Sequence, residues 1–334
     1  MRFKLTKDIN RIFITGGAGY VGAVLVPRLL SEGYIITVFD LMLYGEDVIK
    51  PHPNLKMIKG DIRDADLLNK SITGHDAVIH LACISNDPSF DLSPELGKSI
   101  NLDAFRPLVE ISKQVGVKRF IYASSSSVYG VKEESNVHEE MQLVPLTDYS
   151  RFKAECEKIL IQFQSSEFTT VTIRPATVCG YSPRQRLDVV VNILTNLAFH
   201  KREITVFGGK QLRPNIHIAD MAESYLVLLR APKEAIAGEV FNAGYENQTV
   251  LELAETVQNV VGDDVKLVAT PTDDNRSYHI SSKKIKDKLG FVAKHTIKEA
   301  VEELRRAFED GLLPNSLQDE RYFNIKRMKS VDLR

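Results

Sequence analysis

Short apolar runs alternate with longer amphipathic segments through the first half of the chain. Runs rich in Ile, Val and Phe, typical of buried strands, lie at 11–15, 35–40, 55–58, 77–81, 119–123 and 170–174. Segments with apolar residues at helical spacing lie between them, at 21–31, 64–71, 94–115 and 148–163. This alternation predicts an α/β fold, a Rossmann-type doubly wound parallel sheet with helices on both faces.

The pattern becomes less regular after Arg174. Helices are predicted at 187–200, 219–229, 250–260, 282–289 and 297–309, and strands at 204–207, 216–218 and 239–243. Neither an internal repeat nor a low-complexity linker divides the chain. We therefore expect a first domain over 1–180 with a return near 214–245, and a smaller, interleaved C-terminal α/β lobe formed by 181–213 and 246–334.

A glycine-rich turn joins the first predicted strand to the first predicted helix. Gly16 permits a tight turn, Gly19 lets the backbone approach a pyrophosphate, and Gly22 allows the helix to pack closely on the strand. The N-terminus of the helix adds free N–H groups and a partial positive charge. Asp40 ends the second strand at the distance expected for an acid that binds a ribose. Together these features predict a dinucleotide site.

Asp40 also indicates which dinucleotide is bound. Its carboxylate can accept hydrogen bonds from both ribose hydroxyls, and it repels a 2′-phosphate. The residues that follow, 41–43, offer no arginine to bind that phosphate. The sequence therefore predicts NAD rather than NADP.

Tyr149 and Lys153 lie four residues apart at the start of a predicted helix, so they share one face. The serine-rich segment 124–127 follows the fifth strand, at the edge of the sheet where ligands bind. The Lys153 ammonium and a positively charged nicotinamide both lower the pKa of the phenol, because they favour the phenolate. Such a phenol can exchange a proton with an alcohol. The alternative is a surface Tyr–Lys pair without chemistry.

Composition and charge narrow the class of partner. The 334 residues carry a net charge of −1, which favours neither nucleic acid nor an anionic membrane. We see no secretion signal at 1–10 and no membrane span, so we expect a cytoplasmic protein. The three cysteines lack metal-site spacing, so no metal is predicted. The basic segment 321–334 is interpreted as a solvated terminus.

These motifs resemble those of the extended short-chain dehydrogenase/reductases, specifically the NAD-dependent epimerase/dehydratase family that acts on nucleotide sugars. The resemblance spans nearly the whole chain and is carried by 15–22, Asp40, 60–62, 80–82, Asn101, 124–130, Tyr149, Lys153, 174–175 and 213–220. It implies that Ser125 is the catalytic Ser/Thr beside Tyr149 and Lys153. It also implies homodimers joined through the helices near 94–115 and 149–163.

The resemblance further implies which residues contact the ligands. Asp61 and Ile62 meet the adenine, and Leu81 and Ala82 line the cofactor. The remaining expected cofactor contacts are Gly16, Gly19, Tyr20, Val21, Gly22, Asp40, Asn101, Tyr149, Lys153 and Pro175. The expected contacts to a nucleotide-diphosphate sugar are Ser126, Arg184, Arg186, Asn192, Arg213 and Arg276. Arg213 and Arg276 resemble a clamp on the diphosphate, whereas exposure to solvent is an equal alternative for Arg184 and Arg186.

Departures from the family pattern narrow the set of reactions that we expect. The 4,6-dehydratases carry Asp-Glu directly after the catalytic residue, where this chain has Ser126 and Ser127. Members resembling GDP-fucose synthase or GDP-mannose 3,5-epimerase carry a cysteine at the position of Ser127. Cys179 lies in a later motif and is interpreted as a packing residue. Dehydration and 3,5-epimerisation are therefore not expected.

The preferred hypothesis is a nucleotide-sugar epimerase that oxidises and reduces carbon 4 of an NDP-hexose or NDP-heptose. The segment 174–188 is similar to that of members acting on activated hexoses and heptoses, so a 4-dehydrogenase or 4-ketoreductase is the alternative. A non-catalytic dinucleotide sensor is less favoured, because Ser125, Tyr149 and Lys153 are all present. A reductase of uncharged carbonyl compounds would not need the two clamp arginines.

Overall fold

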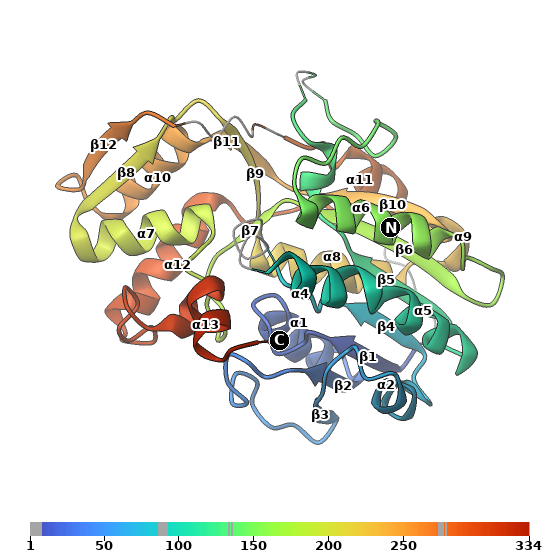
Figure 1. The fold of residues 1–334 in the computed structure, drawn as a ribbon. Helices are drawn as coiled ribbons and strands as arrows, with labels where there is room; N and C mark the ends of the chain where they lie inside the picture. The colour runs from blue at the N-terminus through green and yellow to red at the C-terminus, as the bar shows by residue number, and fades with distance from the viewer. Residues whose placement is uncertain are drawn as a thin grey trace.

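A seven-stranded sheet forms the larger part of the molecule (Figure 1). The computed structural model describes residues 9–85, 93–132, 134, 136–272, 277 and 279–333. The strand order is β10-β6-β5-β4-β1-β2-β3, and every neighbouring pair is parallel. The strands are β1 (Arg11–Thr15), β2 (Ile35–Asp40), β3 (Leu55–Lys59), β4 (Ala77–His80), β5 (Arg119–Ala123), β6 (Thr169–Pro175) and β10 (Glu239–Ala243). The predicted doubly wound α/β fold is confirmed.

Helices cover both faces of this sheet, which explains why the central strands β1, β4 and β5 are buried at nearly every position. Ile12 and Ile14 of β1 face one apolar cluster, and Phe13 between them faces another. The first cluster includes residues of α1 (Gly22–Ser31) and α8 (Ile218–Arg230). The second includes residues of α2 (Ala65–Ile72), α5 (Phe105–Gln114) and α6 (Asp148–Ile161). Alternate side chains of one strand thus join the sheet to both helical layers.

A smaller lobe lies beside the carboxyl ends of the large sheet (Figure 1). It contains a three-stranded sheet of β7 (Thr177–Cys179), β9 (Leu212–His217) and β11 (Glu246–Thr249), and a parallel pair of β8 (Glu203–Phe207) and β12 (Lys266–Thr270). Its helices are α7 (Val190–Lys201), α10 (Val250–Val261) and α12 (Ile297–Glu309), which share one apolar cluster. The predicted boundary at residue 180 falls directly after β7, so the chain enters the smaller sheet a few residues earlier than expected.

Two sequence-based predictions of local structure were wrong. The segment 94–115 is not one helix but α4 (Pro94–Lys98), a π-helical turn η1 (Ser99–Asp103) and α5. The N–H of Ala104 donates to the carbonyl of Ser99, the long spacing of a π turn, which rotates Asn101 into the protein. The segment 321–334 is not a solvated terminus, because it contains α13 (Asn324–Ser330) with Met328 only 7% exposed.

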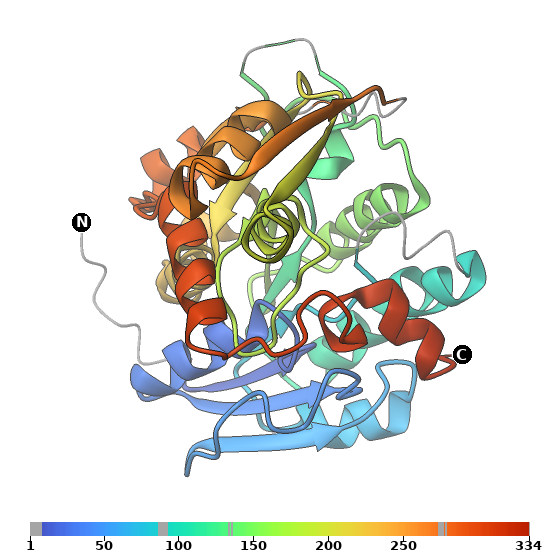
Figure 2. The same cartoon turned by 90° about the vertical axis from the view of Figure 1, so that its left-hand side faces the viewer.

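The C-terminal segment returns from α12 to the side of the large sheet, as the red ribbon shows in both views (Figures 1 and 2). The remaining helices are α9 (Lys233–Ile236), α11 (Lys283–Leu289) and the 3₁₀ turns η2 (Ser126–Tyr129) and η3 (Glu320–Tyr322). Within the described ranges, no helix has the length and apolar character needed to cross a membrane.

Candidate active site

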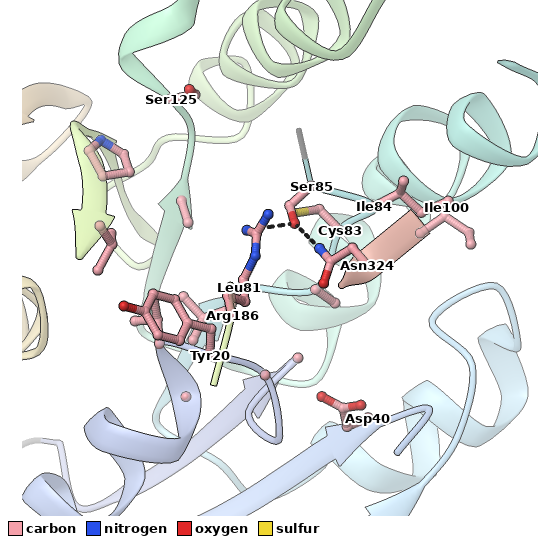
Figure 3. Close-up of a pocket in the computed structure, with 18 of the residues that line it drawn as sticks. Tyr20, Asp40, Leu81, Cys83, Ile84, Ser85, Ile100, Ser125, Arg186 and Asn324 are labelled. Atoms are coloured by element: carbon pink, nitrogen blue, oxygen red, sulfur yellow. Dashed lines mark hydrogen bonds between the residues drawn. The ribbon is translucent and has the colours of Figure 1, made fainter. Parts of the chain in front are cut away.

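A cavity of about 350 Å³ opens at the carboxyl ends of the parallel strands. It lies where the strand order reverses between β1 and β4, the position at which doubly wound sheets bind ligands. Its lining includes most of the predicted site residues, namely Gly16, Gly19, Tyr20, Val21, Gly22, Asp40, Asp61, Ile62, Leu81, Ala82, Ser125, Ser126, Tyr149, Lys153, Pro175, Arg184 and Arg186. Asp40 and Ser125 lie at opposite sides of it (Figure 3).

The glycine-rich turn forms one wall of this cavity. Gly16 has φ +71°, and a Cβ there would lie 2.5 Å from the backbone nitrogen of Ala82. Only glycine therefore allows the turn to approach the end of β4. A Cβ on Gly22 would lie 2.2 Å from the carbonyl oxygen of Gly17, so the expected contact of Gly22 with the strand is corrected to a contact with the turn itself. The first turn of α1 has neither an acidic residue nor a side-chain cap, which leaves it suited to an anion.

Asp40 is fixed by the backbone at the end of β2. Its Oδ2 accepts a bond of 3.0 Å from the N–H of Ala18, and its Oδ1 accepts one of 2.8 Å from the N–H of Met42. Burial raises the pKa of the Asp40 carboxyl, and these two bonds oppose that rise. A rigid acid in the cavity wall, beside a glycine cradle that no side chain fills, fits the adenosine ribose and diphosphate of NAD.

The predicted catalytic residues meet at the other end of the cavity. Thr147 caps α6, and its side chain and that of Ser150 form a capping box that fixes where the helix begins. Tyr149 and Lys153 follow in the first two turns, and Lys153 is 4% exposed. The Lys153 Nζ donates to the Ala123 carbonyl at 2.6 Å. This bond ties the ammonium to the carboxyl end of β5.

Ser125 lies directly after β5 on the same wall. Its Oγ lies 2.8 Å from the Oγ of Ser127 and accepts a bond of 3.1 Å from the Ser127 N–H. Ser126 is 2% exposed but still contributes to the cavity lining. The structure thus brings Ser125, Tyr149 and Lys153 to one region, with an alcohol, a phenol and an ammonium available to a substrate hydroxyl.

A buried ion pair holds α6 against the sheet. Arg174 on β6 donates to Glu157 on α6 at 2.6 Å, and both side chains are less than a tenth exposed. Ser124, next to Ser125, also donates to Glu157. Burial opposes the charge on Arg174, but its bonds to Glu157 outweigh this effect and raise the pKa of the guanidinium. The pair therefore positions the helix that carries Tyr149 and Lys153.

Arg184 is buried and the Arg186 side chain is only 12% exposed, and both line the cavity, so the solvent-exposed alternative is wrong. The Arg186 Nε donates to Asp188 at 2.8 Å and its Nη1 donates to Ser85 at 3.0 Å, while its buried Nη2 has no partner in the described part of the chain. Both Tyr44 and Tyr149 are among the groups whose charge acts on Arg186. Arg186 therefore lies between the two ends of the cavity, beside Ser85 (Figure 3).

Arg184 lies toward the end occupied by Asp40. Its guanidinium stacks over the Tyr44 ring with the Cζ 3.4 Å from the ring centre, and its Nη2 donates to the Asn324 Oδ1 at 2.6 Å. Burial lowers the pKa of Arg184 to about 10, which leaves it charged at neutral pH. It is 4% exposed, and the described residues provide no carboxylate within ion-pair distance.

Two predicted contact residues lie behind the wall rather than in it. The Asn101 Oδ1 accepts a bond from the Ile84 N–H and its Nδ2 donates to the Ile84 carbonyl, each at 2.8 Å, so Asn101 holds the loop after β4. The amide of Asn192 bonds the backbone of Gly180 and of Arg186 and the hydroxyl of Tyr20. Asn192 is fully buried, and the expected substrate contact is therefore corrected to a positioning contact.

The diphosphate clamp of Arg213 and Arg276 stays a prediction. Arg213 lies on β9 and donates to the carbonyl of Leu212, and the lining of the large cavity does not include it. Arg276 lies outside the described residues. Within the described ranges, no group of three or more His, Cys, Asp or Glu side chains is placed to hold a metal ion.

Sequence reasoning missed several cavity residues that come from distant parts of the chain. They are Tyr44, Cys83, Ser85, Met221, Tyr225, Asn324, Met328 and Leu333. The spacing of Phe323, Ile325 and Met328 is a weak signal for a helix in the C-terminal segment. Nothing in the sequence indicates that this helix reaches the cavity.

The parallel sheet, the glycine cradle and the acid at the end of β2 define a dinucleotide-binding α/β protein. The NAD dependent epimerase/dehydratase family model matches residues 12–244, and the chain belongs to this family. The family is NAD-dependent, so the protein is an NAD-dependent enzyme of the nucleotide-sugar epimerase and dehydratase class.

Several curated relatives and solved structures are similar along most of the chain. A dTDP-glucose 4,6-dehydratase of Streptomyces niveus is 28% identical over 326 residues, covering 91% of this chain and 90% of the relative. The UDP-glucose 4-epimerase of Thermotoga maritima, solved with UDP-glucose, superposes with a TM-score of 0.82 at 26% identity, covering 90% of this chain and 99% of that one. The UDP-N-acetylglucosamine 4-epimerase of Methanobrevibacter ruminantium, solved with UDP-N-acetylmuramic acid, has a TM-score of 0.81 at 25% identity, covering 91% and 99%.

Proposed function

We propose that the protein is a nucleotide-sugar 4-epimerase that oxidises and then reduces carbon 4 of an NDP-hexose or NDP-heptose. The observation that carries this proposal is the meeting of Ser125, Tyr149 and Lys153 at one end of a cavity whose other end holds Asp40 and the glycine cradle. The names of the similar epimerases, which act on or bind UDP-sugars, support the same class of substrate.

In this mechanism Tyr149 takes the proton from the 4-hydroxyl. NAD, held by the glycine cradle and Asp40, supplies the hydride acceptor and later the hydride donor. The Lys153 ammonium, fixed by the Ala123 carbonyl, favours the phenolate form of Tyr149. Ser125 holds the substrate hydroxyl in line with Tyr149. If the 4-keto sugar rotates in the site before it is reduced, the hydride returns to its other face, Tyr149 returns the proton, and the 4-epimer is formed.

Loss of water from carbons 5 and 6 needs an acid and a base near the sugar. Ser126 and Ser127 occupy the positions after Ser125. Among the residues that the structure describes, the carboxylates in the cavity lining are Asp40, at the end of β2, and Asp61, shortly after β3, both at the adenosine end. The proposed reaction therefore does not include dehydration.

A 4-dehydrogenase or 4-ketoreductase is the second candidate. The similarity of segment 174–188 to members acting on activated hexoses and heptoses favours it. Arg186 in the cavity wall also favours it, because its Nη2 has no partner among the described residues and suits a substrate with an additional polar group. Both candidate functions include the predicted homodimer and the predicted diphosphate clamp of Arg213 and Arg276.

Product analysis separates the candidates. The purified protein is incubated with NAD and a panel of NDP-hexoses and NDP-heptoses, and the products are analysed by mass spectrometry and NMR. A product of unchanged mass with inverted carbon 4 supports the epimerase, and a product lighter by two hydrogens supports the dehydrogenase. A product that has lost water contradicts both.

A further inference from the structure

The C-terminal segment crosses the mouth of the cofactor cavity. It leaves the smaller lobe, where the carbonyl of Tyr322 accepts a bond of 2.9 Å from the Leu187 N–H, and it runs to the side of the large sheet (Figures 1 and 2). Asn324, Met328 and Leu333 from this segment all line the cavity. Asn324 is 5% exposed and Met328 is 7% exposed, so the segment is packed into the protein.

Asn324 links three separate parts of the cavity wall. Its backbone N–H donates to Asp188 at 2.9 Å, and its Nδ2 donates to the Ser85 Oγ at 2.8 Å. Its Oδ1 accepts the bond from Arg184. Figure 3 shows Asn324 and Arg186 on either side of Ser85, with the Asp40 carboxylate below them. One asparagine thus connects the loop after β4 with the arginine-rich segment of the smaller lobe.

The rest of α13 is fixed to the part of the molecule that carries Asp40. The Arg327 Nε donates to the Leu43 carbonyl at 2.5 Å, in the loop directly after β2, and its Nη1 bonds Glu320 at 2.6 Å. Met328 belongs to the same apolar cluster as Ile62, one of the residues expected at the adenine. The helix therefore lies over the adenosine half of the cavity.

Arg184 adds an electrostatic reason to place an anionic ligand beneath this helix. It is a buried cation whose Nε has no partner among the described residues, and it lies between Tyr44 and Asn324. A buried charge without a counter-charge is costly, and a diphosphate in the cavity reduces that cost. Arg184 therefore faces the cofactor, whereas the family resemblance implied a contact to the substrate.

We propose that α13, joined to Arg184 through Asn324, is a latch that closes over the adenosine half of NAD and keeps the cofactor bound between turnovers. For NAD to leave, the bonds of Asn324 and Arg327 must break and Met328 must be exposed. A retained cofactor suits a reaction that returns its own hydride. That consequence rests on the proposed epimerase function, whereas the latch itself requires only NAD binding.

The latch is tested by the rate at which NADH leaves the protein, with no sugar present. Protein loaded with NADH and freed of excess is mixed with lactate dehydrogenase and pyruvate, which oxidise NADH as soon as it is released. We expect Asn324→Ala, which loses two side-chain hydrogen bonds, to release NADH about tenfold faster than the unmodified protein. A chain ending at Phe323, which also loses the bonds of Arg327 and the burial of Met328, should release it at least as fast. Lys329→Ala, an exposed residue of the same helix, should release it at the unmodified rate.

Hydrogen exchange on the unmodified protein gives a second test that does not depend on a variant folding. With NADH bound, the amides of 324–330 should exchange more slowly than in its absence. Release at the unmodified rate from folded Asn324→Ala, or unchanged exchange in 324–330, overturns the latch. Because neither measurement uses a nucleotide sugar, their failure would leave the proposed epimerase activity standing.

Discussion

The Lys153 Nζ lies 5.8 Å from the centre of the Tyr149 ring, one helical turn along α6. The same ammonium lies 5.1 Å from the centre of the Tyr122 ring and is bonded to the Ala123 carbonyl. It is therefore held in place from the sheet as well as from the helix. This arrangement leaves Tyr149 as the group whose protonation changes in the proposed reaction.

Tyr149→Phe is expected to lower turnover by about 10²–10⁴-fold, the usual effect of losing a general acid and base. NAD binding should stay nearly normal, because the ring remains in the cavity wall. Lys153→Ala should weaken both turnover and NAD binding. Steady-state kinetics and cofactor titration measure the two effects. Tyr245→Phe, which changes an exposed tyrosine, is the control, and normal turnover of Tyr149→Phe would contradict the mechanism.

Asp40→Ala should reduce the preference for NAD over NADP. The variant loses both the hydrogen bonds to the ribose and the repulsion of a 2′-phosphate, so the ratio of the two dissociation constants should fall by roughly 10-fold or more. Titration of both cofactors gives the ratio directly. Asp47→Ala removes the same charge from an exposed position nearby and should leave the ratio unchanged. Equal affinities of the unmodified protein for NAD and NADP would refute the role of Asp40.

Arg213→Ala is expected to raise the KM for the nucleotide sugar and to leave kcat nearly unchanged. A charge-assisted bond to a diphosphate contributes about 1.5–3 kcal/mol, which corresponds to roughly 10- to 150-fold in KM. Lys210→Ala, an exposed cation close in sequence, should have little effect. A loss of kcat at constant KM would instead indicate that Arg213 acts in the chemical step.

His80 should make the protein less stable in acid. Burial, together with the charge of Lys153, lowers the pKa of His80 to about 3, and its Nδ1 lies 2.7 Å from the Thr15 hydroxyl. Below about pH 6.5 the unfolded chain binds a proton at this residue and the folded chain does not, so stability falls as the pH is lowered. The contribution of this one group to the free energy of unfolding should approach about 1.4 kcal/mol per pH unit between roughly pH 6 and pH 4.

Chemical denaturation at several pH values measures this slope. His80→Gln should make the slope of the whole protein shallower by this contribution, whereas His138→Gln, at an exposed position, should leave the slope unchanged. The same slope in His80→Gln as in the unmodified protein would show that His80 is protonated in the folded state.

Much of the large sheet was predictable because its signals are local. The strands at 35–40 and 119–123 were predicted with the bounds that the structure gives, since each is a short apolar run between turns. The smaller strands β7, β11 and β12 were missed, because three to five mixed residues carry no periodicity. The π turn at Ser99–Asp103 was also missed, since helical spacing continues through it.

The sequence by itself determined the parts of the site that lie in one continuous segment. The glycine turn, Asp40 at the end of its strand and the pair Tyr149 and Lys153 each follow from spacing along one element. Their meeting in one cavity follows from the rule that parallel strands present their carboxyl ends at the same edge. These predictions needed no knowledge of how distant segments pack.

Only the tertiary structure decided which distant residues complete the wall. Asn324 reaches Ser85 and Arg184 across separations of 239 and 140 residues, and no local pattern encodes such contacts. The same packing buried Arg184 and turned Asn192 away from the cavity. Burial and pairing are properties of the whole fold, because each depends on what several segments together leave exposed to water. The segment 321–334, predicted to be solvated, was thus packed into the cavity wall through Asn324 and Met328.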